Sequence, residues 1–470
     1  MRSADARGRP MPRGGWAAVA LLAALACQEG SPPTEAGCAL PEIEGSEVAA
    51  NPTNVLSAIV EIRAEQADSI AVRYGRAGLQ PDSLTPAVRA GRDAVLVPVL
   101  GLLPSQPYTV QAVGFNACGS TLGAPLPFVT DQLPADLPVY QAGGPDPTPG
   151  FVAFAAGMYG LVIDNTGRVV WYYRFPSGPG LNFQPQPNGR FVARPNPAPG
   201  EPARWIEISP LGEVTRTMGC ARSLAARPHD MLALEDGSYW LLCDEARVMD
   251  LSPVGGMPDA RVTGTVIQHV GAGADLRFEW SPFDHFAITD LDPAERTGAN
   301  VNWTHGNALA LDGNGSLYVS FRNLDEVTRI DIHSGQVVWR MGGRANQFAF
   351  ADSRVPPFHG QHGLRVVGPG ELLLLDNLGE PGESRAERYT VDHPTRTARL
   401  VGSYGTRPGV IGALGGTTQP LPGNRLLVSF GNGARVEEYD RRGDLVWRIH
   451  GNPGYVFRAH RIPSLYAVAR

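Results

Sequence analysis

Three histidines occupy equivalent positions in successive copies of one repeated pattern. His229, His305 and His362 each stand eight residues before the glycine of a tight turn, and an apolar strand follows each turn. If the repeats close into a ring, equivalent positions face one central channel, so the three imidazoles are predicted to lie there at the same height. Each histidine alone is explained equally well as a structural residue at the start of a strand. The register shared by three of the ten histidines predicts a site.

An arginine is predicted beside this group. Arg322 follows the turn glycine Gly313 by nine residues and His305 precedes it by eight, so an antiparallel hairpin places the two side chains next to each other. A guanidinium fork beside imidazoles suits the oxygens of a sulfate, phosphate or carboxylate. Three convergent histidines could instead bind a metal ion, but the positive charge of Arg322 opposes a cation there.

The other histidines carry weaker signals. His359, three residues before His362, is interpreted either as a supporting partner or as a loop residue, and His285 lies in an insertion without a predicted role. The chain has no His-Glu-x-x-His motif, Gly-rich phosphate loop or Gly-x-Ser-x-Gly elbow. The histidines without a matching register are expected at the surface or in packing: His269, His333, His393, His450 and His460.

The repeats define the elements that must hold these side chains. One element is a tight turn followed by an apolar strand, and the other is a strand–turn–strand hairpin that often ends on tryptophan. Two such hairpins form a four-stranded propeller blade, and about 320 residues divided by six give about 53 residues per blade. We predict a six-bladed β-propeller over residues 151–470, with seven blades as the nearest alternative. The tryptophans expected in the blade cores are Trp171, Trp339 and Trp447.

A smaller β-domain is predicted before the propeller. Residues 38–131 contain short runs that alternate apolar and polar side chains, as expected of strands with one buried face. Residues 102–112 resemble the tyrosine-corner segment of fibronectin type III domains, in which the hydroxyl of Tyr108 would return to the backbone. The fold class is therefore all-β, with a fibronectin type III-like β-sandwich, a linker over residues 132–150 and the propeller.

The first residues are typical of an export signal. Basic residues precede a short apolar run that ends in small residues, which predicts a signal peptide over residues 1–26, or one that begins at Met11. Cys27 follows at once and resembles the lipidated cysteine of bacterial lipoproteins, with simple secretion as the alternative. Residues 27–37 are expected to form a tether, so the protein is predicted to be periplasmic, anchored in the outer membrane by lipid, or secreted.

The other four cysteines form two local pairs. Export implies an oxidising compartment, so disulfides are the expected state, with buried free thiols as the alternative. The chain contains no Cys-x-x-Cys motif. The predicted pairs are Cys38 with Cys118 and Cys220 with Cys243.

Composition limits the classes of partner. The 40 basic and 46 acidic side chains give a formal charge of −6, which argues against a nucleic-acid binder. Hydrophobic residues make up 43% and charged residues 18%, so a large buried core is possible. The 56 glycines and 42 prolines favour short strands and turns over long helices.

The segments around the site resemble the bacterial aryl-sulfate sulfotransferase family. The resemblance rests on four segments spread over the propeller, namely residues 303–309, 320–323, 338–343 and 361–364. It implies transfer of a sulfuryl group between phenols by a ping-pong mechanism, with an aryl sulfate as donor and no cofactor. It also implies that His362 is the nucleophile that forms a sulfohistidine, that Arg322 and His305 bind sulfate oxygens with Asn307, and that His229 is a further acid, base or oxygen ligand.

The chemistry of sulfuryl transfer agrees with these roles. The group carries three equatorial oxygens through a loose transition state, so positioning and charge stabilisation dominate catalysis. A neutral imidazole can attack sulfur, and a protonated neighbouring imidazole is expected to assist the departing phenolate. Two other classes stay open at this point, a non-catalytic binding propeller and a quinone- or metal-dependent propeller enzyme.

Overall fold

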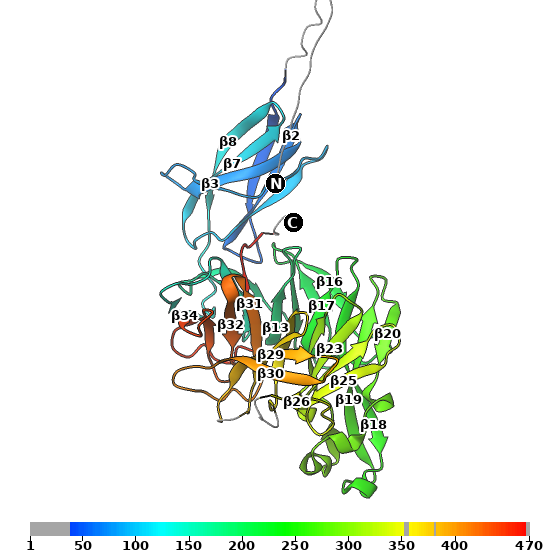
Figure 1. Cartoon of the computed structure of the whole chain (residues 1–470). Coiled ribbons are helices and arrows are strands. Elements are labelled where there is room, and N and C mark those ends of the chain that lie inside the picture. The colour runs from blue at the N-terminus through cyan, green and yellow to red at the C-terminus, as the bar shows by residue number, and fades with distance from the viewer. Residues whose placement is uncertain (1–37, 352–356, 380–381, 467–470) are drawn as a thin grey trace, which may run out of the picture. The chain divides into compact units, whose positions relative to one another are not determined.

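The fold is taken from a computed structural model, which describes residues 38–351, 357–379 and 382–466. The predicted signal peptide, Cys27 and the whole predicted tether lie outside these residues. The chain divides into two units between Ala39 and Leu40, and every described strand belongs to the second (Figure 1).

The described residues form strands and six short 3₁₀ helices, so the all-β prediction is confirmed. No helix in this part of the chain is long and apolar enough to cross a membrane. The 3₁₀ helices are η1 (Ser252–Val254), η2 (Pro282–Asp284), η3 (Ile288–Asp290), η4 (Pro293–Arg296), η5 (Arg322–Leu324) and η6 (Pro422–Asn424).

Two antiparallel sheets pack face to face over the first ninety described residues. One contains β1 (Glu42–Ala50), β2 (Ser57–Glu65) and β6 (Val95–Leu100). The other contains β3 (Ser69–Arg76), β4 (Ser83–Leu84), β5 (Val88–Arg89), β7 (Pro107–Asn116) and β8 (Gly119–Val129). Alternate apolar side chains such as Val60, Val72 and Val110 meet in the core between them. The hydroxyl of Tyr108 accepts a hydrogen bond from the Leu103 N–H at 2.8 Å, as the tyrosine-corner pattern predicts.

Six further sheets lie between Ala142 and Ile462 in the described residues, and their strands pair antiparallel except for one short parallel strand in the third sheet and one in the fifth (Figure 1). The first contains β10 (Phe151–Ala156), β11 (Tyr159–Ile163), β12 (Val169–Arg174) and β35 (Ala459–Ile462). The second contains β13 (Gly180–Pro185), β14 (Phe191–Pro195), β15 (Trp205–Ile208) and β16 (Val214–Met218). The third contains β17 (Ala225–Ala233), β18 (Tyr239–Met249), β19 (Ala260–Val270), β20 (Leu276–Trp280) and β21 (Asn300–Asn302).

The other three sheets follow the same order along the chain. The fourth contains β22 (Gly306–Leu311), β23 (Ser316–Phe321), β24 (Glu326–Asp331) and β25 (Val337–Gly342). The fifth contains β26 (Ala349–Phe350), β27 (His362–Gly368), β28 (Glu371–Asp376), β29 (Arg385–Asp392) and β30 (Thr397–Tyr404). The sixth contains β31 (Thr417–Leu421), β32 (Arg425–Ser429), β33 (Val436–Tyr439), β34 (Leu445–Ile449) and β9 (Ala142–Gly143).

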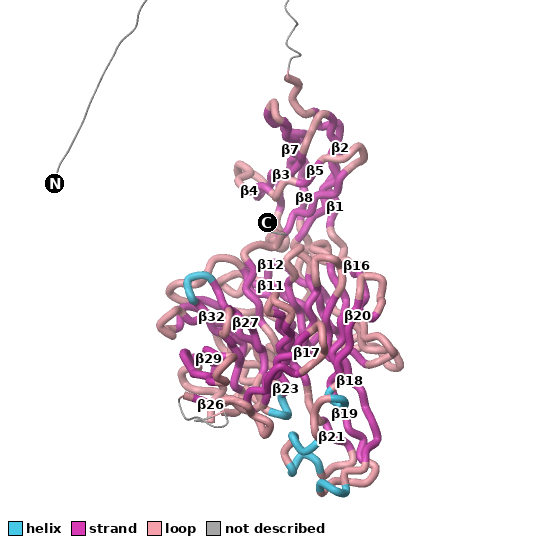
Figure 2. The backbone as a smooth tube through the Cα atoms, turned by 45° about the vertical axis from the view of Figure 1, so that its right-hand side comes forward, coloured by secondary structure: helices cyan, strands magenta, loops and turns pink. Residues whose placement is uncertain are grey.

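One edge strand of each sheet lies next to its counterpart in the following sheet. These strands are β13, β17, β22, β27, β31 and β35, and their contacts run in a closed cycle. We interpret the sheets as the blades of a propeller and these six as its innermost strands. The predicted core tryptophans Trp171, Trp339 and Trp447 are at most 1% exposed. The third blade is the largest, because its long β18–β19 hairpin and the helices η2, η3 and η4 extend beyond the others (Figure 2).

The ring closes through strands from both ends of the propeller sequence. β35 completes the first blade by pairing antiparallel with β10, and β9 adds a fifth strand to the last blade by pairing with β34. Residues 142–143 of the predicted linker are therefore part of the sixth sheet. The sequence pattern did not predict this closure, because two-residue and four-residue strands have too few side chains to show a period.

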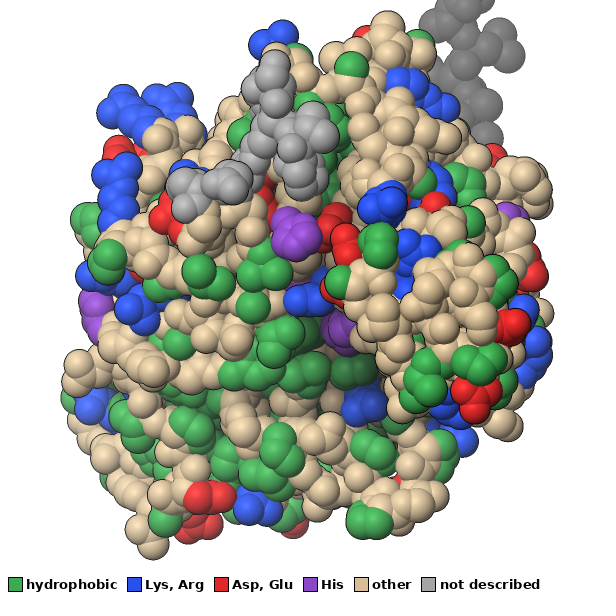
Figure 3. Space-filling model, turned by 90° about the horizontal axis from the view of Figure 1, so that it is seen from below, with side chains coloured by type: hydrophobic (Ala, Val, Ile, Leu, Met, Phe, Trp, Pro, Cys, Tyr) green, Lys and Arg blue, Asp and Glu red, His purple; other side chains and the backbone are tan. Residues whose placement is uncertain are grey.

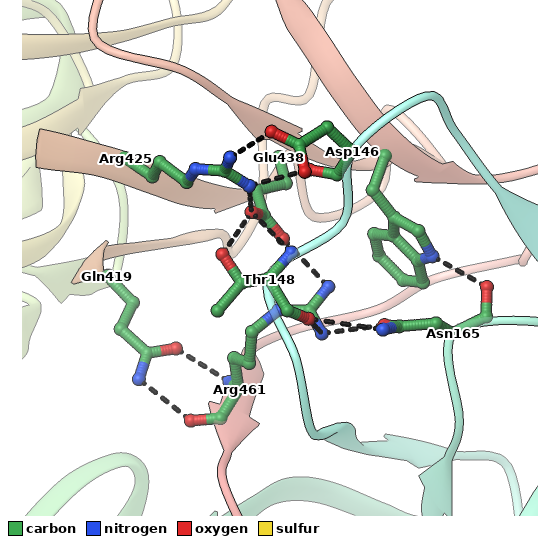
Figure 4. A network of polar contacts seen from close by, with 8 residues as sticks. Asp146, Thr148, Asn165, Gln419, Arg425, Glu438 and Arg461 are labelled. Atoms are coloured by element: carbon green, nitrogen blue, oxygen red, sulfur yellow. Dashed lines mark hydrogen bonds and ion pairs between the residues drawn. The ribbon is translucent and has the colours of Figure 1, made fainter. Parts of the chain in front are cut away.

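A buried polar network joins the same two ends (Figure 4). Arg461 of β35 forms an ion pair of 2.8 Å with Glu438 of β33, and both side chains are at most 2% exposed. Glu438 also accepts a hydrogen bond of 2.5 Å from the Thr148 hydroxyl, and Arg461 donates to the side chain of Asn165 at 2.7 Å. These contacts connect the first and last blades by charge as well as by backbone pairing.

Candidate active site

Three consecutive inner strands bring the predicted histidines together. His229 lies within β17, His305 directly precedes β22, and His362 is the first residue of β27. The Nε2 atoms of His229 and His305 are 3.1 Å apart, and the ring centroids of His229 and His362 are 6.4 Å apart. The structure therefore places the three imidazoles in one cluster, as their shared register predicts.

Each of the three inner strands that carry these histidines has an irregular pairing register at or next to the histidine. The pairing register shifts between Ala226 and Met231 in β17, a stretch that includes His229. It shifts again directly after His362 in β27 and one residue after His305 in β22. His305 itself has a φ of 47°, in the left-handed region that few side chains adopt. Bulges of this kind redirect side chains beside active sites.

The hydrogen bonds of His362 determine which ring nitrogen is free. Its Nδ1 lies 2.9 Å from the side-chain oxygen of Asn377 and 3.1 Å from the carbonyl oxygen of Gly360. Both partners are acceptors, so Nδ1 carries the proton and donates it. Nε2 therefore keeps its lone pair, which is the form an imidazole needs to act as a nucleophile.

A chain of polar contacts passes through the other two imidazoles. Arg227 donates from Nε to Nδ1 of His229 at 3.4 Å, so the proton of neutral His229 lies on Nε2 and faces His305. On its other side, Nδ1 of His305 lies 2.7 Å from the side-chain nitrogen of Asn302, an exposed residue of β21. These contacts connect the buried cluster to its rim.

Arg322 lies beside the cluster, and no described carboxylate is within ion-pair distance of it. It starts η5 immediately after β23, and its backbone N–H donates to the His305 carbonyl at 3.1 Å. Its Nη1 donates to the Asn323 side chain at 3.0 Å and its Nη2 to the Ala413 carbonyl at 3.3 Å. Its buried Nε has no hydrogen-bond partner within the described ranges, and no carboxylate there forms an ion pair with it. This guanidinium is therefore available to an anion.

Asn307, the residue predicted to help bind sulfate, is fully buried beneath the histidines. One N–H of its side chain donates to the Gln361 carbonyl at 2.7 Å, directly before His362. The backbone carbonyl oxygen of Asn307 accepts a hydrogen bond from Arg458 at 2.7 Å, and Arg458 forms a 3.1 Å ion pair with Asp230. The side chain of Asn307 thus bonds to the Gln361 carbonyl and keeps one further N–H, while its side-chain oxygen has no partner among the described residues.

Burial and nearby cations keep the imidazoles neutral. Burial lowers the pKa of His362 to about 3, against its hydrogen bond to Asn377 and with help from the charge of Arg322. Burial also lowers the pKa of His305 to about 2, with the charge of Arg227 acting in the same direction. The pKa of His229 is lowered well below its ordinary value, again mainly by burial. We expected a protonated imidazole next to the nucleophile. This prediction is wrong for the site without substrate, where the imidazoles are neutral and only a neutral N–H can donate.

Aromatic and apolar side chains lie next to the cluster. The ring of Phe457 approaches His229 edge-on at 5.6 Å, and Tyr455 packs against Phe457 at 6.2 Å. Tyr455 is 42% exposed, Leu378 is 37% exposed and Leu414 is 49% exposed. Figure 3 shows histidine side chains near the centre of one face of the molecule, one of them deep in a hollow, with acidic, basic and hydrophobic side chains around them.

Four of the other histidines have partners other than the three imidazoles. His359 forms a 2.8 Å ion pair with Asp325, whose hydrogen bond raises the pKa of His359. His285 stacks on Trp280 at 5.0 Å in the third blade, which gives it a packing role. Stacking on tryptophan also accounts for His269 and His393, as expected of packing residues.

Several residues of the site were not predicted from the sequence. His362 is contacted by Asn377, His305 by Asn302 and His229 by Arg227. None of these partners stands at the distance from a blade turn that the three histidines share. The only sequence signal for Asn377 is the polar pair Asp376–Asn377 at the end of an apolar strand, a position like that of Arg322 and Asn323 after β23. Within the described residues, no group of three or more His, Cys, Asp or Glu side chains could hold a metal ion.

The predicted disulfides agree with the structure. Cys220 and Cys243 are joined across 23 residues of chain. Cys38 and Cys118 are disulfide-bonded as well. Four of the five cysteines are therefore oxidised, and the fifth, Cys27, lies outside the described residues.

Together these features define a class of protein, a β-propeller whose central histidines and unpaired arginine can receive a small anion. A family model described as Arylsulfotransferase (ASST) matches residues 151–436, which is more than half of the chain. The chain belongs to the arylsulfotransferase family, as the motifs around His305, Arg322 and His362 indicated. Membership supports aryl sulfate sulfotransferase activity in general, with small aryl sulfates and phenols as substrates.

Solved structures with similar folds are distant. A protein of unknown function from Bacteroides caccae is 12% identical with a TM-score of 0.44, and the match covers 66% of this chain and 98% of that one. A streptogramin B lyase is 11% identical with a TM-score of 0.38, covering 66% and 84%. A calcium-binding regucalcin from Agrobacterium tumefaciens is 14% identical with a TM-score of 0.34, covering 68% and 95%. No curated protein sequence matches the chain.

Proposed function

We propose that the protein transfers a sulfuryl group from an aryl sulfate to a phenol by a ping-pong mechanism, with His362 as the nucleophile. The observation that carries this proposal is the orientation of His362. Its Nδ1–H is held by two acceptors, so its Nε2 lone pair is free beside the unpaired Arg322.

In the first step the sulfate ester binds with its anionic oxygens toward Arg322. The guanidinium has unused N–H groups, and charge-assisted hydrogen bonds to such oxygens are about twice as strong as neutral ones. His305 and His229 can add imidazole donors, and the spare N–H of Asn307 can add another. The exposed ring of Tyr455, which packs against Phe457 beside His229, is an aromatic surface that the aryl group could contact.

The transfer then proceeds in two balanced displacements. Nε2 of His362 attacks sulfur while the bond between sulfur and the aryl oxygen breaks, and the aryl oxygen leaves with the electron pair. The departing oxygen accepts a hydrogen bond from the neutral pair His229–His305 and leaves as the aryl oxide, which takes its proton from water. The acceptor phenol next gives its proton to an imidazole of this pair and attacks sulfur, and the electrons of the N–S bond return to Nε2. The pair then releases that proton to water.

The test compares two histidine variants. His362→Ala removes the proposed nucleophile, while His333→Ala changes an exposed turn histidine and serves as the control. We expect His362→Ala to lose release of nitrophenol from p-nitrophenyl sulfate in the presence of phenol, and His333→Ala to keep it. After donor alone, intact mass spectrometry should detect one sulfonate group on wild type, located on a peptide containing His362. Normal turnover by His362→Ala would refute the assignment.

We also propose that the protein is exported, with Cys27 as a lipid anchor and residues 38–131 as a spacer before the propeller. The disulfide-bonded cysteines support an oxidising compartment, because cytosolic reductants keep most thiols reduced. Incorporation of a radiolabelled fatty acid that is lost in Cys27→Ser would test the anchor. Equal labelling of the two proteins, or none, would contradict it.

A further inference from the structure

The partner of the His362 ring is an amide whose orientation the fold specifies. The Asn377 side-chain nitrogen donates to the carbonyl oxygens of Gly412 and Gly415, at 2.5 and 2.9 Å. Its side-chain oxygen is therefore the atom that faces Nδ1 of His362. A flipped amide would bring N–H against N–H on one side and oxygen against oxygen on the other. Asn377 is fully buried, so water could not compensate for either clash.

Further contacts fix the segment around Asn377. The Ser384 hydroxyl donates to the Asn377 carbonyl at 2.7 Å and accepts from the Gly412 N–H at 2.7 Å. Gly412 cannot carry a side chain, because a Cβ there would lie 2.0 Å from the Phe430 carbonyl oxygen. The next residue, Ala413, accepts from Arg322. Residues 412–415 thus orient both the partner of the nucleophile and the predicted sulfate-binding arginine.

We propose that Asn377 is a positioning residue that keeps His362 in the Nδ1–H tautomer, and that its neutral amide keeps the sulfonated His362 reactive toward the acceptor. This inference rests on the proposed function. It explains why residue 377 is an asparagine, although the carboxylate of an aspartate could accept the same hydrogen bond from His362.

The reason lies in the charge of the intermediate. Attack by Nε2 leaves the imidazole ring positively charged, with a sulfonate on Nε2 and the proton on Nδ1. A carboxylate at the Asn377 position would stabilise this cation, as the aspartate of a Ser-His-Asp triad stabilises its imidazolium. The ring would then be a poorer leaving group when the phenol attacks. An amide orients the ring without adding a negative charge.

The test separates the two half-reactions in Asn377→Asp and Asn377→Ala. Release of nitrophenol without acceptor reports sulfonation, and loss of the sulfonate mass after phenol is added reports transfer. A carboxylate next to an imidazole raises its pKa by about 1–3 units, so we expect Asn377→Asp to slow the transfer step about tenfold or more and to accumulate sulfonated enzyme. We expect Asn377→Ala to slow sulfonation about tenfold without accumulation, because the ring loses its orientation.

Asn432→Asp is the matched control. Asn432 is exposed and accepts from the Leu414 backbone, so its variant adds the same charge near the same loop without touching His362. We expect both of its half-reactions to stay within about twofold of wild type. If Asn377→Asp transfers sulfonate to phenol as fast as Asn432→Asp does, the charge argument is overturned.

A measurement on the unmodified protein tests the tautomer without relying on activity. Nitrogen NMR of histidine-labelled protein, with His362→Gln used for assignment, should show His362 protonated on Nδ1 and bare on Nε2. The opposite tautomer would overturn the positioning role even if every variant failed to fold. A correct tautomer in a protein that never becomes sulfonated would instead refute the proposed function and leave the geometry of Asn377 standing.

Discussion

Substitution of Arg322 should reveal how much of the activity depends on its unpaired guanidinium. Two of its N–H groups bond to neutral acceptors and its Nε is buried without a partner, so a bound sulfate oxygen would receive its full charge. A hydrogen bond to a charged group contributes about 1.5–3 kcal/mol, and each 1.4 kcal/mol corresponds to about tenfold in rate. Arg322→Ala should therefore lower kcat/KM for p-nitrophenyl sulfate by about 10- to 150-fold. Arg322→Lys keeps the charge but loses the fork, and we expect a smaller loss than that of Arg322→Ala.

The assay is steady-state release of nitrophenol at several donor and phenol concentrations. Because Arg322 is expected to bind the sulfate group in both half-reactions, kcat/KM should fall for donor and acceptor alike. Arg441→Ala, which removes an exposed arginine from the turn between β33 and β34, is the control and should behave as wild type. The reasoning would be refuted if Arg322→Ala kept kcat/KM within about threefold of this control, since that loss is smaller than one charge-assisted hydrogen bond.

Two further predictions concern the stability of the propeller. Glu438→Gln leaves the buried guanidinium of Arg461 without a counter-charge, so urea unfolding should show a loss of about 3–5 kcal/mol. Asp146→Asn, at the exposed side of the same network, should cost less than about 1 kcal/mol, and equal losses would contradict the argument. Burial lowers the pKa of His362 to about 3, so below pH ~6.5 the unfolded chain binds a proton that the folded chain does not. The free energy of unfolding is therefore highest above that pH and decreases as the pH falls. The contribution lost between pH 7 and 5 is about 2 kcal/mol, and His362→Gln should show a correspondingly smaller loss in unfolding measurements at the two pH values.

The sequence predicted the cluster because the propeller repeats its geometry. His229, His305 and His362 share one offset from the blade turn, and the structure brings all three together. Arg322 could be added because an antiparallel hairpin makes residues on either side of a turn neighbours. Both arguments use only spacing along the chain, which a regular strand converts directly into position.

The remaining contacts could not be predicted in this way. Asn377 reaches His362 through a bulge and a glycine-rich loop, and Asn302 reaches His305 from the insertion in the third blade. Such contacts depend on where irregular segments fold back, and these have no period to extrapolate. The lowered pKa values were missed for a related reason, because burial belongs to the closed ring and no single strand reveals it.

The distribution of charge explains why this cluster suits an anion. The buried carboxylate of Asp230, next to His229 in the chain, is already paired with Arg458, and Asp244 is paired with Arg227. The imidazoles are neutral, so within the described residues Arg322 is the cation of the cluster that has no ion-pair partner. An aryl sulfate carries one negative charge, which would supply the missing partner. Once it binds, its charge opposes the effect of the arginines on His229 and His305, and these imidazoles can then accept the proton of an incoming phenol more readily.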